Sequence, residues 1–306
     1  MKLYKILFMI ISSLMLGPCQ ADRDFTYTVS EKYVPLIKQR IDMINKWAVW
    51  HGDTASKEII TDKNEIEYDT GDAVLFNGLL CSSGTQRACL AVKKSQGDDG
   101  RWYRSEFHKN IDTENSFSRD MAKGVILYLI TTKDVTAAEK WLNYINKTGR
   151  LCNDDTDGRC SMTGTTASLI YYAWKELGLE PPEFTIESAK MDDFNMMFSA
   201  RYSKVGYNLH LVGVNAYIQI ILNRLNRYYD VRAIEIIHER QKNNPFFQYL
   251  YEGSTDRVVE STLNWCTGEE PENKDQWSFE RDESSDAKMH SMGHDCIFLL
   301  QLFLKQ

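Results

Sequence analysis

Six strongly apolar segments recur along the chain about every 45 residues, and each begins at a polar residue or a glycine-marked turn. Each is paired with a segment whose apolar residues repeat with the 3.6-residue period of an amphipathic helix, such as residues 137–145 and 233–241. Two helices per repeat predict an all-α fold of six helical hairpins that close into a toroid, with the apolar helices inside. The apolar segments begin near Gly71-Asp72, Ser116-Phe117, Ser161-Met162, Tyr207-Asn208, Asn244-Pro245 and His290-Ser291.

The same pattern gives the expected bounds of the helices. Polar segments at 51–71 and 267–289 are expected to be loops, and residues 101–104 an extended segment near the mouth of the toroid. No Pro-, Gly- or Ser-rich linker divides the chain, so residues 22–306 are expected to form one domain, near the upper size for a single core. Inner helices are expected at 72–80, 117–130, 163–177, 209–225, 245–251 and 292–304, and outer helices at 31–50, 87–95, 134–149, 187–200, 231–241 and 255–265.

Residues 1–21 have the character of a secretory signal peptide. Lys2 and Lys5 precede an apolar run, and a small-x-small cleavage motif ends at Ala21. The run is shorter than the roughly 20 apolar residues that a membrane-spanning helix needs. A second interpretation is a lipoprotein box with an acylated Cys19, which the preceding Pro18 fits poorly. The sequence thus predicts a periplasmic or secreted protein.

Six cysteines remain after residue 21, and an even number in an exported chain indicates disulfides. Six cysteines allow 15 pairings. A zinc site is the alternative, but the chain lacks CxxC spacing and nearby histidines. Spacing favours pairs across a short turn, around a loop and between the two cysteines left over: Cys81–Cys89, Cys152–Cys160 and Cys266–Cys296.

The charge of the chain restricts its partners. The formal net charge is −7, and loss of Lys2 and Lys5 with the signal peptide makes it about −9. An acidic chain without a basic run argues against nucleic acid and against anionic membrane surfaces. The abundant Trp and Tyr suit helix packing, and they also suit stacking with sugar rings.

The starts of the inner helices are the expected place for function. In a toroid these helices run parallel, so their free N–H groups and macrodipoles meet at one mouth, which attracts carboxylates and hydroxyl-rich ligands. The candidate residues are therefore the polar ones at these starts: Asp72; Arg119 and Asp120; Thr163 and Thr165; Asn208 and His210; Asn243 and Asn244; and His290, His294 and Asp295.

Three acids are the candidate catalytic residues: Asp72, Asp120 and Asp295. Asp72 and Asp120 stand at helix starts, where a capping or first-turn acid with a purely structural role is the alternative. Arg119 beside Asp120 forms a pair that suits the binding of a carboxylate or a sugar acid. Asp295 lies one turn into an apolar helix, where a structural role is harder to assign.

Aromatic side chains near charged clusters are candidates for sugar stacking, with packing of the loops as the alternative. These are Trp102, Tyr103 and Trp277. With them, the predicted substrate-binding set includes Arg119, Asn208, His210 and His294.

Two patterns are relevant to metals. Asn153, Asp155 and Asp157 match the opening of a calcium loop, but the acid expected at the twelfth position is absent, and the neighbouring disulfide would fix the loop without metal. His290 and His294 share a helical face, but the glutamate of the zinc protease motif is missing. The sequence therefore predicts no cofactor, with calcium as the open alternative.

Several segments together resemble the six-hairpin (α/α)6-toroid glycosidases and their polysaccharide-lyase relatives. The resemblance is one of architecture over most of residues 22–306, and it implies a carbohydrate-facing mouth with acid and base carboxylates. The segments that carry it are Gly71-Asp72 to Cys81, Ser118-Arg119-Asp120-Met121, Trp277 to Arg281 and Ser291 to Asp295.

The expected function is that of an exported enzyme that cleaves a glycosidic bond, which requires two carboxylates across one mouth. The pair is expected among Asp72, Asp120 and Asp295, with Glu280 or Asp282 as loop-borne alternatives. Hydrolysis and β-elimination both stay open; a lyase would need Arg119 to neutralise a uronate and a base such as His210, His294 or Tyr207. The alternative is a non-catalytic secreted or surface protein that binds glycans or serves as a scaffold.

Overall fold

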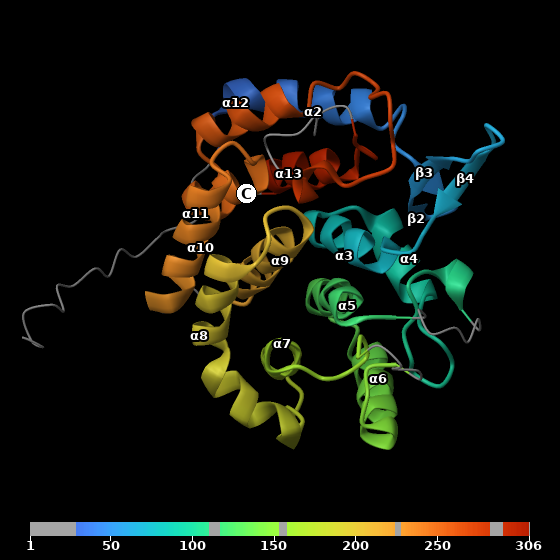
Figure 1. The fold of residues 1–306 in the computed structure, drawn as a ribbon, viewed down its shortest axis with the longest axis vertical. Coiled ribbons are helices and arrows are strands. Elements are labelled where there is room, and N and C mark those ends of the chain that lie inside the picture. Colours follow the sequence, from blue (N-terminus) through green and yellow to red (C-terminus); the bar gives the residue numbers. More distant parts are fainter. Residues whose placement is uncertain (1–28, 110–116, 153–157, 224–227, 282–289, 306) are drawn as a thin grey trace, which may run out of the picture.

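The computed structural model describes residues 29–109, 117–152, 158–223, 228–281 and 290–305 (Figure 1). The signal peptide, Cys19, the calcium-loop residues Asn153, Asp155 and Asp157, and Asp282 lie outside these ranges. The described chain is mostly helical, as expected. Its α-helices are α2 (Val34–Ile44), α3 (Ala73–Ser83), α4 (Gln86–Lys94), α5 (Arg119–Thr132), α6 (Val135–Thr148), α7 (Gly164–Glu176), α8 (Ile186–Tyr202), α9 (Tyr207–Ile221), α10 (Tyr228–Arg240), α11 (Pro245–Glu252), α12 (Asp256–Trp265) and α13 (His294–Leu304).

Short 3₁₀ turns accompany the helices: η1 (Glu31–Tyr33), η2 (Glu106–His108), η3 (Glu183–Thr185) and η4 (Ser278–Glu280). In the described part of the chain, none of the helices combines the length and apolar character that a bilayer crossing would need.

Two small antiparallel hairpins occupy the segment that was expected to be a polar loop. They are β1 (Trp50–His51) with β2 (Thr54–Ala55), and β3 (Lys57–Ile60) with β4 (Ile66–Asp69). Ile59, Ile60, Ile66 and Tyr68 favour strands, and Asn64 accepts the positive φ of 58° in the connecting turn. The expectation of a polar loop was therefore wrong for this segment.

The outer helix expected at 31–50 also ends early, at Ile44. Tertiary contacts hold the chain that follows in a different conformation. Trp47 Nε1 donates to the carbonyl of Gly268 at 3.0 Å, and the Val49 amide donates to the carbonyl of Met292 at 3.4 Å. These bonds join the residues after α2 to the C-terminal part of the chain.

The apolar and amphipathic helices take different places. In Figure 1, α3, α5, α7, α9 and α13 lie toward the middle of the view, whereas α2, α6, α8 and α12 lie at its margin. Among the helices nearer the middle, α3 packs against α5 and α13, and α5 also contacts α7 and α9. At the margin α8 packs against α7 and α10. The most apolar segments thus form the shared interior.

Two glycines bring α3 and α5 into close contact. Gly78 of α3 faces the backbone of Gly124 in α5, and a Cβ at either position would overlap the backbone of the other helix. Helices approach this closely only where the side chain is absent at the crossing point. The contact fixes the positions of the starts of α3 and α5 relative to each other.

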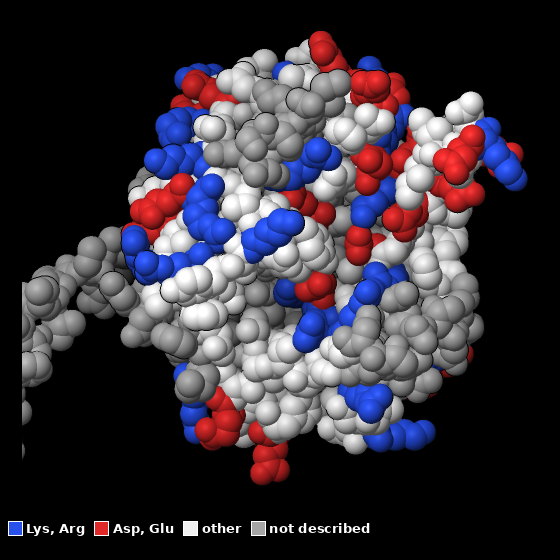
Figure 2. Space-filling model, viewed as in Figure 1, with Lys and Arg blue, Asp and Glu red and all other residues white. Residues whose placement is uncertain are grey.

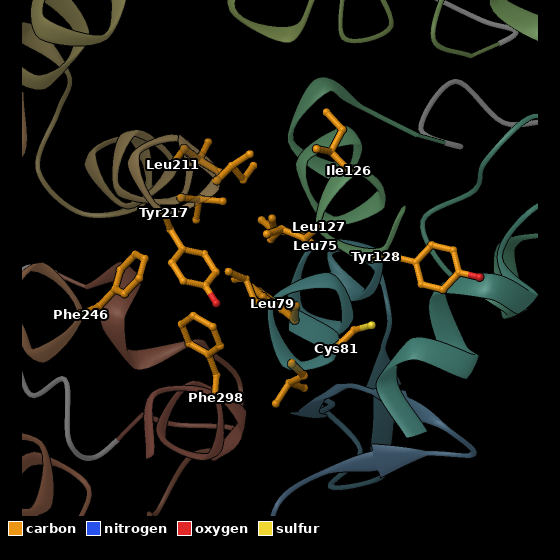
Figure 3. Close-up of a cluster of buried hydrophobic side chains, with 14 of the residues drawn as sticks. Leu75, Leu79, Cys81, Ile126, Leu127, Tyr128, Leu211, Tyr217, Phe246 and Phe298 are labelled. Carbon is orange, nitrogen blue, oxygen red and sulfur yellow. The ribbon is translucent and has the colours of Figure 1, made fainter. Parts of the chain in front are cut away.

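One hydrophobic cluster connects the helices, from Val29 to Phe303. Figure 3 shows its centre, where Tyr217 of α9 lies between Phe246 of α11, Phe298 of α13 and Leu79 of α3. The Tyr217 hydroxyl lies 3.0 Å from the hydroxyl of Ser82, so its polar atom is satisfied inside the core.

The three disulfides that the spacing favoured are confirmed: Cys81–Cys89, Cys152–Cys160 and Cys266–Cys296. The first joins α3 to α4, and the third joins the end of α12 to the first turn of α13. Disulfides persist in oxidising compartments, so the protein belongs outside the cytoplasm.

Candidate functional site

A pocket of about 380 Å³ opens where the starts of α3, α5 and α9 meet. Acidic and basic side chains lie side by side at a hollow in the face that Figure 2 shows, over these helices. The lining residues are Asp72, Arg104, Ser118, Arg119, Asp120, Arg159 and Tyr207. Two of the three candidate catalytic acids, Asp72 and Asp120, therefore lie in one pocket.

Asp72 occupies the N-cap position of α3, but its side chain makes no capping hydrogen bond. Its carboxylate instead faces two cations. Lys57 Nζ, from β3, lies 2.7 Å from Oδ2, and Arg104 Nη1 lies 3.7 Å from Oδ1. Arg104 is held in place by a hydrogen bond of 2.7 Å to the carbonyl of Gly71. The Asp72 carboxylate thus contacts two cations at the pocket and does not cap α3.

Asp120 lies in the first turn of α5, two residues after the N-cap Ser118, and both residues line the pocket. The Ser118 hydroxyl caps the helix by accepting from the Met121 amide at 3.4 Å, so the carboxylate of Asp120 is not needed as a cap. Lys123 Nζ lies 3.0 Å from Asp120 Oδ1, and the Tyr207 hydroxyl donates to Oδ2 at 3.0 Å.

The charges around Asp120 set its protonation. Burial alone would raise the pKa of the Asp120 carboxyl, but Lys123, the Tyr207 hydroxyl and Arg119 outweigh it and hold that pKa below the usual range. Burial and the nearby acids Asp120, Asp72 and Glu280 raise the pKa of Tyr207 well above that of a free phenol. At neutral pH the pair is therefore an ionised carboxylate and a protonated phenol.

Close to the pocket residues Asp72 and Tyr207 lies a buried acid–histidine pair. Glu280 Oε1 of η4 is 3.4 Å from His210 Nδ1 of α9, and both side chains are almost completely buried. Burial raises the pKa of Glu280, with the nearby Asp72 adding to the rise and His210 and Lys57 opposing it. Glu280 and His210 were both sequence candidates, and the structure brings them together, although neither lines the pocket.

Asp295, the third candidate acid, lies outside this pocket. It is fully buried, and its Oδ2 accepts hydrogen bonds from the Ser278 hydroxyl and the Phe279 amide, while Oδ1 accepts from Ser291. Asn244, another candidate, caps α11 and donates to the carbonyl of Phe279 at 2.9 Å. Both side chains anchor the segment that carries Glu280.

The aromatic candidates also lie elsewhere. Trp102, Tyr103 and Trp277 are buried. Trp102 packs edge-on against Tyr128, and Trp277 stacks on Phe76 with their ring centroids 4.7 Å apart. Large aromatic side chains stabilise a helical core through this packing. No face of these rings lines the pocket.

The remaining polar candidates take local roles. His294 is fully buried; its Nε2 lies 2.6 Å from the carbonyl of Val49, and burial lowers its pKa to about 4. His290 Nδ1 lies 2.8 Å from Asp275 Oδ1. The Thr163 hydroxyl caps α7 by accepting a hydrogen bond from the Thr166 amide. Asn208, Asn243 and Thr165 lie at helix starts without lining the pocket between α3, α5 and α9.

Sequence reasoning missed three cations of the site, Lys57, Lys123 and Arg159. The fourth, Arg104, belongs to the segment 101–104 that was expected near the mouth, although it was not among the candidate residues. Lys123 follows Asp120 by three residues on one helix, a spacing that places the two side chains together, so this pair could have been found. Lys57 and Arg104 come from segments without periodicity, and only the fold brings them to Asp72. No sequence signal marks Lys57.

Metal binding gains no support from the described residues, among which no group of three or more His, Cys, Asp or Glu side chains could hold an ion. Comparison of the sequence with protein-family models and with curated proteins finds no match. The fold and the site define a mostly helical, disulfide-bonded protein with a mixed-charge pocket at the convergence of three helix starts.

Proposed function

We propose that this protein is an exported enzyme that cleaves a glycosidic bond in the pocket at the starts of α3, α5 and α9. The observation that supports the proposal most is the presence of Asp72 and Asp120 in one pocket. Glycosidic cleavage requires two carboxyl groups that flank the bond. Both side chains face the pocket and its cations instead of capping their helices.

The proposed architecture is a toroid of six helical hairpins. The alternation of apolar helices (α3, α5, α7, α9, α11, α13) with amphipathic ones supports it, as do the contacts of α3 with both α5 and α13. In such a toroid the pocket would be the mouth at the N-terminal ends of the inner helices.

In the proposed hydrolysis, Asp120 acts as the base, because its cationic and hydroxyl neighbours keep it ionised. It takes a proton from a water molecule, and the oxygen of that water attacks the anomeric carbon. Asp72, the other carboxyl group of the pocket, accepts a hydrogen bond from the Lys57 ammonium and passes a proton from it to the leaving oxygen as the glycosidic bond breaks. The products are two sugars, one with a new reducing end.

A second candidate reaction is β-elimination. The hydrogen bond from Tyr207 to Asp120 favours it, because Asp120 can accept the phenolic proton while Tyr207 removes a proton from the carbon next to a carboxylate. A C=C bond then forms as the glycosidic C–O bond breaks, and the leaving oxygen takes up a proton from water. The product would be an unsaturated sugar instead of a hydrated one.

The test uses residues 22–306 with a panel of oligosaccharides and compares Asp72→Asn and Asp120→Asn with the matched control Asp42→Asn. Asp42 lies exposed on α2, away from the pocket. We expect each pocket variant to lose at least about a hundredfold in turnover and to keep sugar binding, because general acid–base catalysis contributes roughly 10²–10⁴-fold. Asp42→Asn should behave like the parent protein.

Product analysis separates the alternatives. New reducing ends without unsaturation identify hydrolysis, and an unsaturated product identifies elimination. Sugar binding without either product would show a non-catalytic glycan-binding protein, and full activity of both pocket variants would remove these residues from the mechanism.

A further inference from the structure

We propose that the outer edge of β4 is a docking surface for an extended segment of a partner protein, one in which basic and apolar residues alternate. The segment adds to β4 as a third strand. None of the residues of β4 lines the pocket between α3, α5 and α9, so this surface is distinct from the proposed catalytic site.

The backbone of β4 presents unpaired hydrogen-bonding groups on its outer side. Glu58 of β3 lies opposite Tyr68 of β4, and the Glu58 amide donates away from β4, to the carbonyl of Lys274 at 2.9 Å. Antiparallel strands alternate between pairs with and without hydrogen bonds, so Glu58–Tyr68 and Ile60–Ile66 are both pairs without them. The amides and carbonyls of Ile66 and Tyr68 therefore point outward, and they have no partner in the part of the chain that the structure describes.

Large apolar side chains are exposed beside this edge. Ile60 is 61% exposed, Ile66 58% and Tyr68 49%. Directly opposite residues and alternate residues of a strand point to the same side of a hairpin, so these three side chains share one face. Proteins usually protect a strand edge with a bulge, a proline or a covering segment, and an exposed apolar edge is a template for another strand.

Contacts at the base of the hairpin hold this edge in a fixed orientation. Lys57 Nζ, at the start of β3, lies 2.7 Å from Asp72 Oδ2. The Tyr68 ring stacks on His51 with centroids 5.0 Å apart, and His51 stacks on Phe107 at 4.0 Å. The rest of the hairpin projects from the helices (Figure 1). A preformed edge lowers the entropic cost of adding a strand.

The side chains of β4 specify the chemistry of the partner. Acidic and apolar residues alternate over residues 65–69, so Glu65 and Glu67 lie on the face opposite the apolar one. Both glutamates are exposed and form no ion pair within the described residues. Opposite charges directly across two strands stabilise their pairing. The complementary strand therefore carries Lys or Arg opposite the two glutamates and apolar residues opposite Ile66 and Tyr68.

A second copy of this chain does not meet these requirements. Two β4 edges that pair antiparallel about a two-fold axis place an acid of one copy opposite an acid of the other, whether the pairing centres on Ile66, Glu67 or Tyr68. Like charges directly opposite each other destabilise a strand pair. The acidic strand thus favours a basic partner over a copy of itself.

The experiment measures the binding of short fluorescent peptides to residues 22–306 by anisotropy. One peptide alternates valine and lysine, and another alternates valine and glutamate. A further peptide is the valine–lysine sequence with N-methylated valines, which keeps the charge and loses the amide donors that face β4. The proteins are the parent, the Glu65→Lys/Glu67→Lys double variant, and the matched control Glu139→Lys/Glu180→Lys, whose glutamates are exposed elsewhere on the surface.

We expect the valine–lysine peptide to bind the parent protein about tenfold or more tightly than either of the other peptides. Glu65→Lys/Glu67→Lys should reverse the preference in favour of the valine–glutamate peptide, and the control double variant should keep the preference of the parent. Amide hydrogen exchange gives a second readout: the bound peptide should protect the amides of Ile66 and Tyr68. The thermal midpoint of each variant checks that it is folded.

Equal affinity for the lysine and glutamate peptides overturns the proposal, and so does an affinity that N-methylation leaves unchanged, because the strand edge is then not the contact. Absence of binding by every peptide overturns it as well. A dimer in sedimentation velocity whose formation protects the Ile66 amide identifies a second copy as the occupant and overturns the basic partner.

Discussion

The Tyr207 hydroxyl donates a hydrogen bond of 3.0 Å to Asp120 Oδ2, although 87 residues separate the two in sequence. The first residue of α9 thereby meets the first turn of α5 across the pocket. This bond favours the ionised carboxylate, and together with Lys123 it keeps the pKa of Asp120 low. It is the direct link between the two helix starts on which the proposed chemistry depends.

Replacement of Tyr207 by Phe should raise the pKa of Asp120, because one hydrogen bond to the charged form is lost. If Asp120 is the base, the acidic limb of the pH–activity profile should shift to higher pH. The profile of kcat/KM measures this shift, with Tyr202→Phe as the control, since Tyr202 lies 65% exposed on α8. An unchanged acidic limb in Tyr207→Phe would show that this hydrogen bond does not set the protonation of the catalytic base.

The Gly78–Gly124 crossing predicts a large stability effect of a single methyl group. Gly124→Ala should lower the free energy of unfolding by roughly 1–3 kcal/mol or more, since the new Cβ would overlap the backbone of α3 near Val74. Gly164→Ala is the control, because its Cβ would meet only Asn195, at 3.9 Å. Urea unfolding of both variants measures the difference, and equal stabilities would contradict the close crossing.

His294 predicts a loss of stability in acid. Its pKa is lowered from 6.5 to about 4 by burial, so below pH 6.5 the unfolded chain binds a proton that the folded protein excludes. Stability should therefore fall as the pH drops from 6.5 to about 4, by about 3 kcal/mol in total for this group. Chemical unfolding at several pH values, compared between the parent protein and His294→Gln, isolates the contribution.

In His294→Gln this part of the pH dependence should be absent, whereas His290→Gln, at a more accessible position beside Asp275, should retain it. A parallel decline of stability in the parent protein and His294→Gln would show that other groups cause the acid sensitivity.

The disulfides should differ in their importance for the site. Cys266–Cys296 closes 30 residues and Cys81–Cys89 closes 8, so chain entropy predicts losses of roughly 3–4 and roughly 2–3 kcal/mol on removal. Cys296 is also next to Asp295, which anchors the segment of Glu280. Alanine replacement of both cysteines in each pair, followed by unfolding and ligand-binding measurements, tests this.

We expect the Cys266/Cys296 double variant to be less stable and to bind ligand more weakly, and the Cys81/Cys89 double variant to keep its affinity. A larger loss of affinity from the Cys81/Cys89 pair would contradict the proposed role of the segment around Glu280.

The sequence determined the helices and the disulfides because both depend on local features. Hydrophobic period and helix caps placed each helix that was expected to be apolar within a few residues of its observed bounds. Short cysteine spacings paired Cys81 with Cys89 and Cys152 with Cys160. The Asp72 and Asp120 positions followed from the same pattern, since each marks a helix start. Each of these features depends only on residues that are close together in the sequence.

Tertiary structure alone decided which side chains share a site. Lys57 and Arg104 reach Asp72 from β3 and from an extended segment, and Tyr207 reaches Asp120 from α9. Trp102, Trp277 and Asp295, by contrast, fill the interior and anchor a loop. Contacts of this kind depend on how helices cross and on which faces they bury. The hydrophobic period of one helix shows which of its faces is buried, but it does not show which other helix packs against that face.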